Sequence, residues 1–223
     1  RSTLFPYTTL FRSASYGDKM GKLVSENSRE SQPGIGPEHD GSYAGVIDIH
    51  GGDITAKGGQ YAAGIGGCED RSSGTITIYD GKINSVGGEN GAGIGGGEGG
   101  SGTVTKIHGG TIYAQGGVEA AGIGGGEKND GGGDSGLVEI HGGDITAVGG
   151  GEKNNSNDQL GGAGIGGGKN GPQTGPIIIL GGKITAWGAH NSAGIGGGSG
   201  GSGGTIEIHG GIVTAWGDQL GAG

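Results

Sequence analysis

The two tryptophans of the chain, Trp187 and Trp216, occupy the same place in a repeated stretch of sequence. Each directly follows a tripeptide in which Ile or Val precedes Thr and Ala. Indole rings at matching positions of neighbouring repeats can offer an apolar platform on which a sugar ring stacks. Thr185, Thr214 and Asp218 lie close by in sequence and supply hydrogen-bonding groups. These residues form the predicted carbohydrate-binding site; the alternative is that the indoles only cover a hydrophobic corner or cap the array.

Histidine occupies a single position of the repeat in four copies: His50, His108, His141 and His209. Tyr79 and Leu180 fill the same position in two other copies. A metal site would require ligands from neighbouring repeats, but only two of the histidines are consecutive. We therefore predict that the histidines pack at a corner and that the chain binds no metal and no cofactor.

An acidic loop at residues 126–136 is the one candidate for calcium. Glu127, Asn129, Asp130 and Asp134 could collect oxygen ligands there. The nonapeptide repeat by which glycine- and aspartate-rich rolls bind calcium does not recur in the chain. A solvated acidic loop is the favoured interpretation. Cys68, the single cysteine, replaces a glycine of the repeat and has no partner for an internal disulfide.

Catalysis on polysaccharides needs paired carboxylates, or a basic side chain beside acidic metal ligands. Within the repeats Arg71 is the only arginine. The outward strand positions never place two carboxylates on neighbouring repeats. We predict that the chain is not an enzyme, and a degenerate polysaccharide-degrading β-helix is the less favoured alternative.

The composition narrows the class of protein that could hold these residues. Glycine accounts for 66 of the 223 residues but proline for only 5, and the glycines are clustered, which excludes collagen. The net charge of −9 disfavours nucleic acid and anionic membrane surfaces as partners. The sequence has no run of 18 apolar residues, so we predict no membrane insertion.

Isoleucine recurs with a regular spacing between the glycine clusters. Ile65, Ile94 and Ile123 lie 29 residues apart, each within the block AGIG. Ile165 comes later than this spacing requires, because two insertions, within 126–136 and 149–161, lengthen the repeat that precedes it. Insertions confined to two corners are typical of loops on a regular scaffold.

Each repeat divides into three short sides separated by glycine turns. β-branched residues between glycine turns are typical of short strands, and stacked repeats can share a core. The sequence therefore predicts an all-β fold, a parallel β-helix (β-solenoid) of about six coils with three short strands and about 29 residues per coil. A propeller is the alternative, although its blades need more residues. We expect an inward-facing core that includes Ile78, Ile83, Ile94, Ile107, Ile112 and Ile123.

Side chains at outward positions should also align from coil to coil. The first position of the second side brings Asp53 opposite Lys82 and Asp144 opposite Lys183. Both pairs are expected to form ion pairs that indicate register more than stability.

The ends of the chain are expected to differ from its repeats. Residues 1–13 resemble the translation of a widely used sequencing adapter, so we expect them to be dispensable and to lie apart from the solenoid. Residues 14–30 are predicted to be a poorly defined lead-in, and residues 31–223 the solenoid domain. The final residues restart the third side and stop before its isoleucine, which predicts a truncated C-terminus.

The segments GGDITAVGG, GTITIYDGKI and AGIGGG resemble the glycine-rich repeats of large secreted bacterial surface proteins. Such proteins are often described as adhesin-like or carbohydrate-binding. The resemblance covers about residues 31–223 and implies a secreted or cell-surface location. We accordingly predict a structural or adhesive repeat module without catalysis, with extracellular polysaccharide or host glycan as partner. The alternative is a carbohydrate-binding β-helix that uses the tryptophans.

Overall fold

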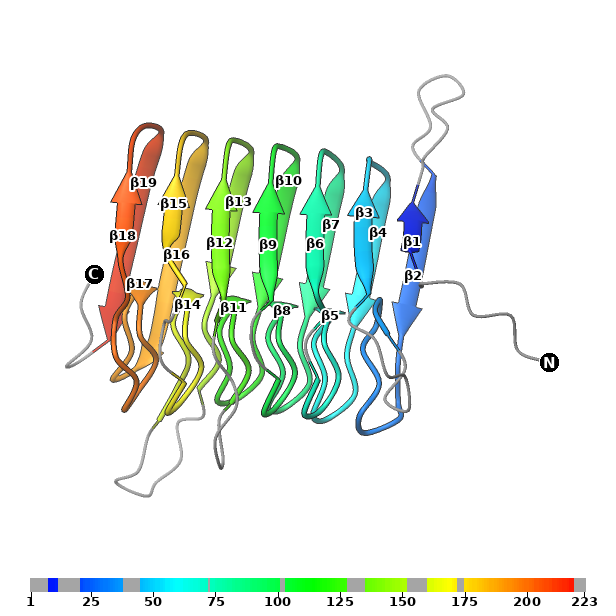
Figure 1. The fold of residues 1–223 in the computed structure, drawn as a ribbon, viewed down its shortest axis with the longest axis horizontal. Helices are drawn as coiled ribbons and strands as arrows, with labels where there is room; N and C mark the ends of the chain where they lie inside the picture. Colours follow the sequence, from blue (N-terminus) through cyan, green and yellow to red (C-terminus); the bar gives the residue numbers. More distant parts are fainter. Residues whose placement is uncertain are drawn as a thin grey trace.

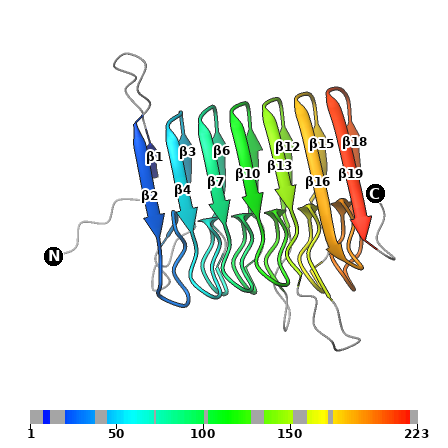
Figure 2. The same ribbon diagram turned by 180° about the vertical axis from the view of Figure 1, so that it is seen from behind.

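The chain folds into a parallel β-helix of about six coils. The computed structural model describes residues 8–11, 21–37, 45–71, 73–100, 103–127, 135–151, 160–171 and 175–218. Within these ranges the coils follow one another along a single axis and build three parallel sheets (Figures 1 and 2). No helix long and apolar enough to cross a membrane occurs in the described ranges. The predicted fold class is confirmed.

The three sheets take one strand each from successive coils. The first sheet consists of β1 (Thr8–Phe11), β3 (Val46–Ile49), β6 (Thr75–Ile78), β9 (Val104–Ile107), β12 (Leu137–Ile140), β15 (Ile177–Ile179) and β18 (Ile206–Ile208). The second sheet consists of β2 (Lys22–Glu26), β4 (Asp53–Lys57), β7 (Lys82–Val86), β10 (Thr111–Gln115), β13 (Asp144–Val148), β16 (Lys183–His190) and β19 (Ile212–Asp218). The third sheet consists of β5 (Ile65–Gly66), β8 (Ile94–Gly95), β11 (Ile123–Gly124), β14 (Ile165–Gly166) and β17 (Ile195–Gly196).

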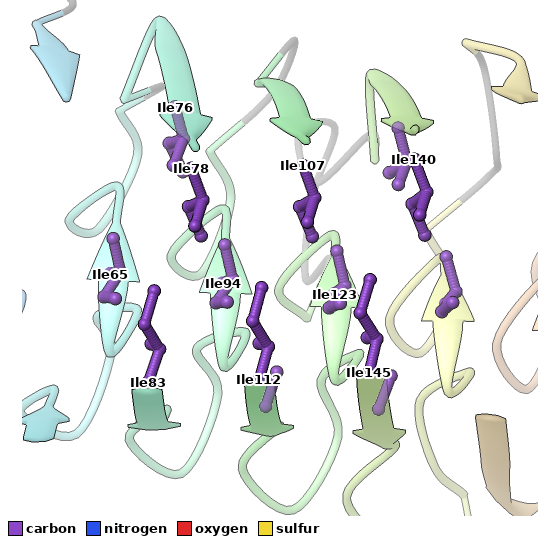
Figure 3. Close-up of a cluster of buried hydrophobic side chains, with 14 of the residues drawn as sticks. Ile65, Ile76, Ile78, Ile83, Ile94, Ile107, Ile112, Ile123, Ile140 and Ile145 are labelled. Carbon is purple, nitrogen blue, oxygen red and sulfur yellow. The ribbon is translucent and has the colours of Figure 1, made fainter. Parts of the chain in front are cut away.

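Identical positions of neighbouring coils lie directly opposite each other, so isoleucines stack in columns inside the solenoid. Ile78 pairs with Ile107 in the first sheet, and Ile94 with Ile123 in the third. The six isoleucines predicted to face inward are all buried, and Figure 3 shows their columns meeting between the three sheets. Because burial of one such side chain contributes about 1.5–3 kcal/mol, the shared core is the main source of stability.

Glycine in the third sheet is required by the close approach of neighbouring coils. Gly95 has a φ of 138°, a backbone conformation that other residues rarely adopt. A Cβ atom at this residue would lie only 2.0 Å from the carbonyl oxygen of Gly124 on the next coil. The AGIG block therefore repeats because any larger residue would push the coils apart.

The register of the third sheet continues across the insertion that begins after β13. Gly151 and Gly161 form an antiparallel bridge that closes the base of the insertion. The chain then continues into β14, whose Ile165 pairs with Ile123 of the preceding coil. The regular scaffold expected around the insertions is therefore present.

The N-terminal boundary differs from the prediction. Thr8–Phe11 pairs in parallel with β3, so the expectation that residues 1–13 lie apart from the solenoid is wrong for these four residues. Threonine, leucine and phenylalanine favour strands, and β3 offers them an unpaired edge. The solenoid also begins before residue 31, because Lys22–Glu26 supplies the first strand of the second sheet. At the other end, residues 219–223 lie outside the described ranges.

Thr105 places in the core a hydroxyl that no other described residue satisfies. Thr105 is fully buried in the column that Ile76 and Val138 occupy on the neighbouring coils. Its Oγ1 forms no hydrogen bond with any described residue. Ser85, also buried, instead donates a hydrogen bond of 2.6 Å to the carbonyl oxygen of Gly93.

Replacing Thr105 with valine is expected to raise the free energy of unfolding by about 1 kcal/mol, because an unsatisfied buried hydroxyl carries a desolvation cost. Urea denaturation of the variant measures the change. Ser85→Ala is the matched control and should lower stability by roughly 0.5–1.5 kcal/mol, since it removes a hydrogen bond that is made. A destabilised Thr105→Val variant would contradict this interpretation.

Candidate functional site

The outward face of the second sheet presents three rows of side chains that run along the solenoid axis. In β16, Ile184 and Ala186 point into the core while Lys183, Thr185 and Trp187 face outward. The same alternation and register hold from β2 to β19. Outward side chains of equal position therefore lie side by side on successive coils.

We name these rows by their order along each strand. The first row consists of Lys22, Asp53, Lys82, Thr111, Asp144, Lys183 and Ile212. The middle row consists of Val24, Thr55, Asn84, Tyr113, Thr146, Thr185 and Thr214. The last row consists of Glu26, Lys57, Val86, Gln115, Val148, Trp187 and Trp216.

The two tryptophans stack on adjacent coils at the end of the last row, as expected. The centroids of the Trp187 and Trp216 rings are 3.9 Å apart and their planes differ by 14°. The side chains are 42% and 41% exposed. Because the rings lie face to face, each covers one face of the other, and their edges rather than a shared flat surface point outward. A sugar would stack on one free ring face or contact both edges.

The other predicted site residues lie beside this pair. Thr185 and Thr214 are directly opposite each other in the middle row. The carboxylate of Asp218 lies 3.6 Å from Nδ1 of His190. The structure thus brings all the predicted sugar-binding residues to one end of the second sheet, but Asp218 already has a partner.

One of the two ion pairs predicted in the first row is present. Lys183 Nζ lies 3.0 Å from the carboxylate of Asp144. Asp53 and Lys82 lie opposite each other on β4 and β7, but these two described residues form no ion pair, so that prediction is wrong. Both side chains are solvated, and exposed pairs contribute only about 0–1 kcal/mol, which is too little to hold them together.

A shallow groove of about 690 Å³ separates the first row from the middle row. Its lining residues are Lys22, Asp53, Thr55, Lys82, Ile83, Asn84, Thr111, Ile112, Tyr113, Asp144, Thr146 and Lys183. The groove crosses the strands from β2 to β16 and runs parallel to the axis. The sequence interpretation missed the groove, because it treated the first row only as an indicator of register.

The histidine position forms a stack of rings at the corner between the first and second sheets. His50, Tyr79, His108 and His141 stack in this order, with centroid distances of 4.5, 5.1 and 4.5 Å. The tyrosine continues the stack that the sequence reading treated as interrupted. Among the described residues no group of three or more histidine, cysteine or acidic side chains could hold a metal ion.

Carboxylates accumulate at the turn after the third sheet. Glu69, Glu98 and Glu127 each lie four residues after a third-sheet isoleucine, on three consecutive coils. The prediction that no two carboxylates share a position on neighbouring coils concerned outward strand positions and did not consider this turn. The glutamate that follows a GGG or GGC block in each of these three repeats could have revealed this alignment from the sequence.

Glu127 belongs to a compact cluster that joins two coils. Lys169 Nζ lies 2.6 Å from Glu119 Oε1 and 3.1 Å from Glu127 Oε1. Burial raises the pKa of Glu127 to about 7, and a hydrogen bond with Glu119 adds to this. Burial also raises the pKa of Glu119, but its hydrogen bonds with Glu127 and Lys169 outweigh that effect and lower it. The ammonium group of Lys169 thus contacts one carboxyl with a raised pKa and one with a lowered pKa.

This arrangement fits a structural clamp better than a pair of catalytic carboxyls. Glycosidases hold their two carboxyls about 5–9.5 Å apart, with the substrate or a water between them. Glu119 and Glu127 instead hydrogen bond to each other, and both contact the ammonium group of Lys169. The cluster fastens one coil to the next.

The clamp predicts a pH dependence of stability. The pKa of Glu127 is higher in the folded chain than in the unfolded one, so its stabilising effect is complete below about pH 4.5 and is lost as the pH rises through 7. Glu127→Gln, which resembles the neutral carboxyl, should be more stable than the parent at pH 8 by about 1–3 kcal/mol. Urea denaturation between pH 5 and 8 measures both proteins. Parallel pH profiles would contradict the prediction.

The predictions for the acidic loop and for Cys68 have different outcomes. Asn129, Asp130 and Asp134 of the proposed calcium loop lie outside the described residues, while Glu127 is held by the clamp. Cys68 is buried, and burial raises the pKa of its thiol, which disfavours the reactive thiolate.

Comparison with known proteins agrees with this architecture. Five segments match the family described as Beta helix repeat: residues 47–67, 76–98, 106–127, 177–199 and 206–223. The stretch between the third and fourth segments contains both insertions, which alter the spacing of the repeat. The chain thus carries a region of β-helix repeats. No curated protein and no solved structure is significantly similar to the chain.

Proposed function

We propose that the chain is a structural and adhesive repeat module that binds a surface polymer without cleaving it. The observation that carries this proposal is the register of the three outward rows of the second sheet, which is continuous from β2 to β19. Register repeats each outward position at intervals of about 4.8 Å, so the sheet offers a long, rigid surface with regularly spaced polar groups. A surface of this kind suits a polymer with a repeating structure.

The proposed partner is an extracellular polysaccharide or host glycan, and the proposed location is the cell surface or the secreted fraction. Support comes from the resemblance of the repeats to those of secreted bacterial surface proteins. The net charge of −9 adds support, because it disfavours nucleic acid as a partner.

Affinity electrophoresis tests the adhesive function. The chain should migrate more slowly in gels that contain at least one soluble glycan from a panel of plant polysaccharides and mucin than in gels without glycan. A globular protein of similar size and charge is the control and should be unaffected. Equal migration of the chain in all gels would rule out the adhesive function.

The tryptophan pair supports a second candidate, a carbohydrate-binding β-helix with its site at the end of the last row. Two exposed indoles in a chain with 4% aromatic residues form an apolar patch that usually has a purpose. Binding through so small a surface is expected to be weak, with a Kd near 1 mM, about −4 kcal/mol. Avidity would strengthen it if several copies act together.

Fluorescence titration with the same glycans tests this candidate, because both indoles should change emission when a sugar covers them. The double variant Trp187→Ala/Trp216→Ala has no tryptophan left to report binding, so affinity electrophoresis measures it; binding at this end of the sheet should be abolished. Binding that persists unchanged in the double variant would exclude the tryptophans as the site.

A further inference from the structure

The groove between the first and middle rows has a shape and chemistry that the tryptophan pair lacks. We propose that this groove binds a linear polysaccharide that lies parallel to the solenoid axis. This inference rests on the adhesive function proposed above and names its site, which lies away from the tryptophans and was not among the residues predicted from the sequence.

The length and direction of the groove favour an extended polymer. Its lining residues come from six successive strands of the second sheet, β2 to β16. Five steps of about 4.8 Å make it about 24 Å long. A pyranose ring in an extended chain spans roughly one strand spacing, so successive sugars meet successive coils in similar surroundings.

The lining supplies the groups that sugars require. Hydroxyl and amide groups of Thr55, Asn84, Thr111 and Thr146 can exchange hydrogen bonds with sugar hydroxyls. Tyr113 lies near the middle of the groove, is 40% exposed and is held by a hydrogen bond of 2.9 Å from its hydroxyl to Gln115 Oε1. Its ring offers an apolar surface for the CH groups of a sugar.

Lys82 contributes to the groove a cation that no described carboxylate holds. Lys82 makes no ion pair within the part of the chain that the structure describes, although Asp53 lies on the adjacent strand. On the outward face of the first sheet, by contrast, Lys106 Nζ is paired with Glu139 at 3.3 Å. The ammonium group of Lys82 is therefore available to a ligand hydroxyl or carboxylate.

An extended peptide fits the same groove less well. Peptides that bind to sheets usually add a strand to an open edge and gain main-chain hydrogen bonds. The strands in the middle of the groove, β7 and β10, are paired on both sides. A peptide lying across them would find side chains but no free backbone groups, whereas a polysaccharide needs only the side chains.

Affinity electrophoresis with one neutral linear β-glucan and one linear polyuronate tests the proposal. The groove variant is Lys82→Ala/Tyr113→Ala. The matched control is Lys106→Ala/Tyr79→Ala, which removes the same residue types from the first sheet and the adjoining corner; Tyr79 is 43% exposed. Circular dichroism and thermal unfolding establish that both variants are folded.

The groove variant should raise the dissociation constant for the retained polymer about tenfold or more, whereas the control should stay within about twofold of the parent. Retention of the glucan would indicate that contacts with sugar hydroxyls dominate. Retention of the polyuronate alone would indicate that the charge of Lys82 dominates. Either result supports the groove if the groove variant weakens it. Equal retention of parent and groove variant would overturn the groove while leaving the adhesive function intact. Failure of the parent to be retained by either polymer would overturn the groove proposal, and the adhesive function only if the whole glycan panel also failed.

Discussion

Replacing Gly95 with alanine is expected to lower the free energy of unfolding by about 2–6 kcal/mol. Two costs add up in this variant. The φ of 138° is strained for any residue with a side chain, at about 1–3 kcal/mol. The new Cβ would also lie 2.0 Å from the carbonyl oxygen of Gly124, and relieving such overlap in packed structure costs about 1–3 kcal/mol or more.

Gly196→Ala separates the two costs. Gly196 occupies the same position on a later coil and has a φ of 137°. Its nearest potential contacts among the described residues are the side chains of Ala193 at 3.3 Å and Ile206 at 3.9 Å, and no backbone atom of these residues beyond its own chain neighbours lies within 4 Å. This variant should therefore lose only about 1–3 kcal/mol. Urea denaturation of both proteins gives the comparison, and equal losses would mean that coil-to-coil contact does not explain the glycine.

Replacing Ile107 with alanine is expected to cost about 2–5 kcal/mol, because it leaves a cavity in the middle of a continuous column. Ile107 is fully buried and lies between Ile78 and Ile140 of the adjacent coils. Neither neighbour can move to fill the space without breaking the register of the first sheet. The loss should appear as a lower midpoint in urea with an unchanged dependence on denaturant.

Lys106→Ala, one residue earlier on the opposite face, is the matched control. Its side chain is solvated and pairs with Glu139 at the surface, so the change should stay within about 0.5 kcal/mol. Similar costs for the two substitutions would show that the assignment of inward and outward residues is wrong.

The core could be predicted from the sequence because every coil repeats the same pattern of inward isoleucines and outward polar residues. Ile78 and Ile107 occupy equal positions in the repeat, and stacking in register follows once one coil is closed. The regular spacing predicted which isoleucines align even where an insertion separates Ile123 from Ile165, and these two residues pair on adjacent coils. The same logic placed Trp187 beside Trp216.

Features without a repeated signature were missed. The strand Lys22–Glu26 has no glycine-flanked Ile-Thr-Ala tripeptide, so nothing in its composition marks it as part of a coil. In the clamp, Lys169 and Glu127 hold equivalent places after Ile165 and Ile123, which pair in register, so their proximity could have been predicted, but the contact of Lys169 with Glu119, at another place in the repeat, could not. The groove is formed jointly by side chains of the first and middle rows from several coils. No single position of the repeat therefore indicates it.

If the chain cleaved polysaccharides, the carboxyls that the structure brings together would be the candidate catalytic groups. A hydrolase or lyase would shorten its polymer, whereas an adhesive module would only bind it. Glu119 and Glu127 are the described carboxyls for which a hydrogen bond to each other is found. Substitution of either one separates a catalytic role from a structural one.

The viscosity of the most strongly retained polysaccharide, followed for hours in the presence of the chain, is the most direct test of binding without cleavage. We predict a constant viscosity with no new reducing or unsaturated ends, while the chain remains bound and can be released intact. A steady fall in viscosity that Glu119→Gln or Glu127→Gln abolishes, in a variant that stays folded and bound, would contradict the account and identify the clamp as an active site.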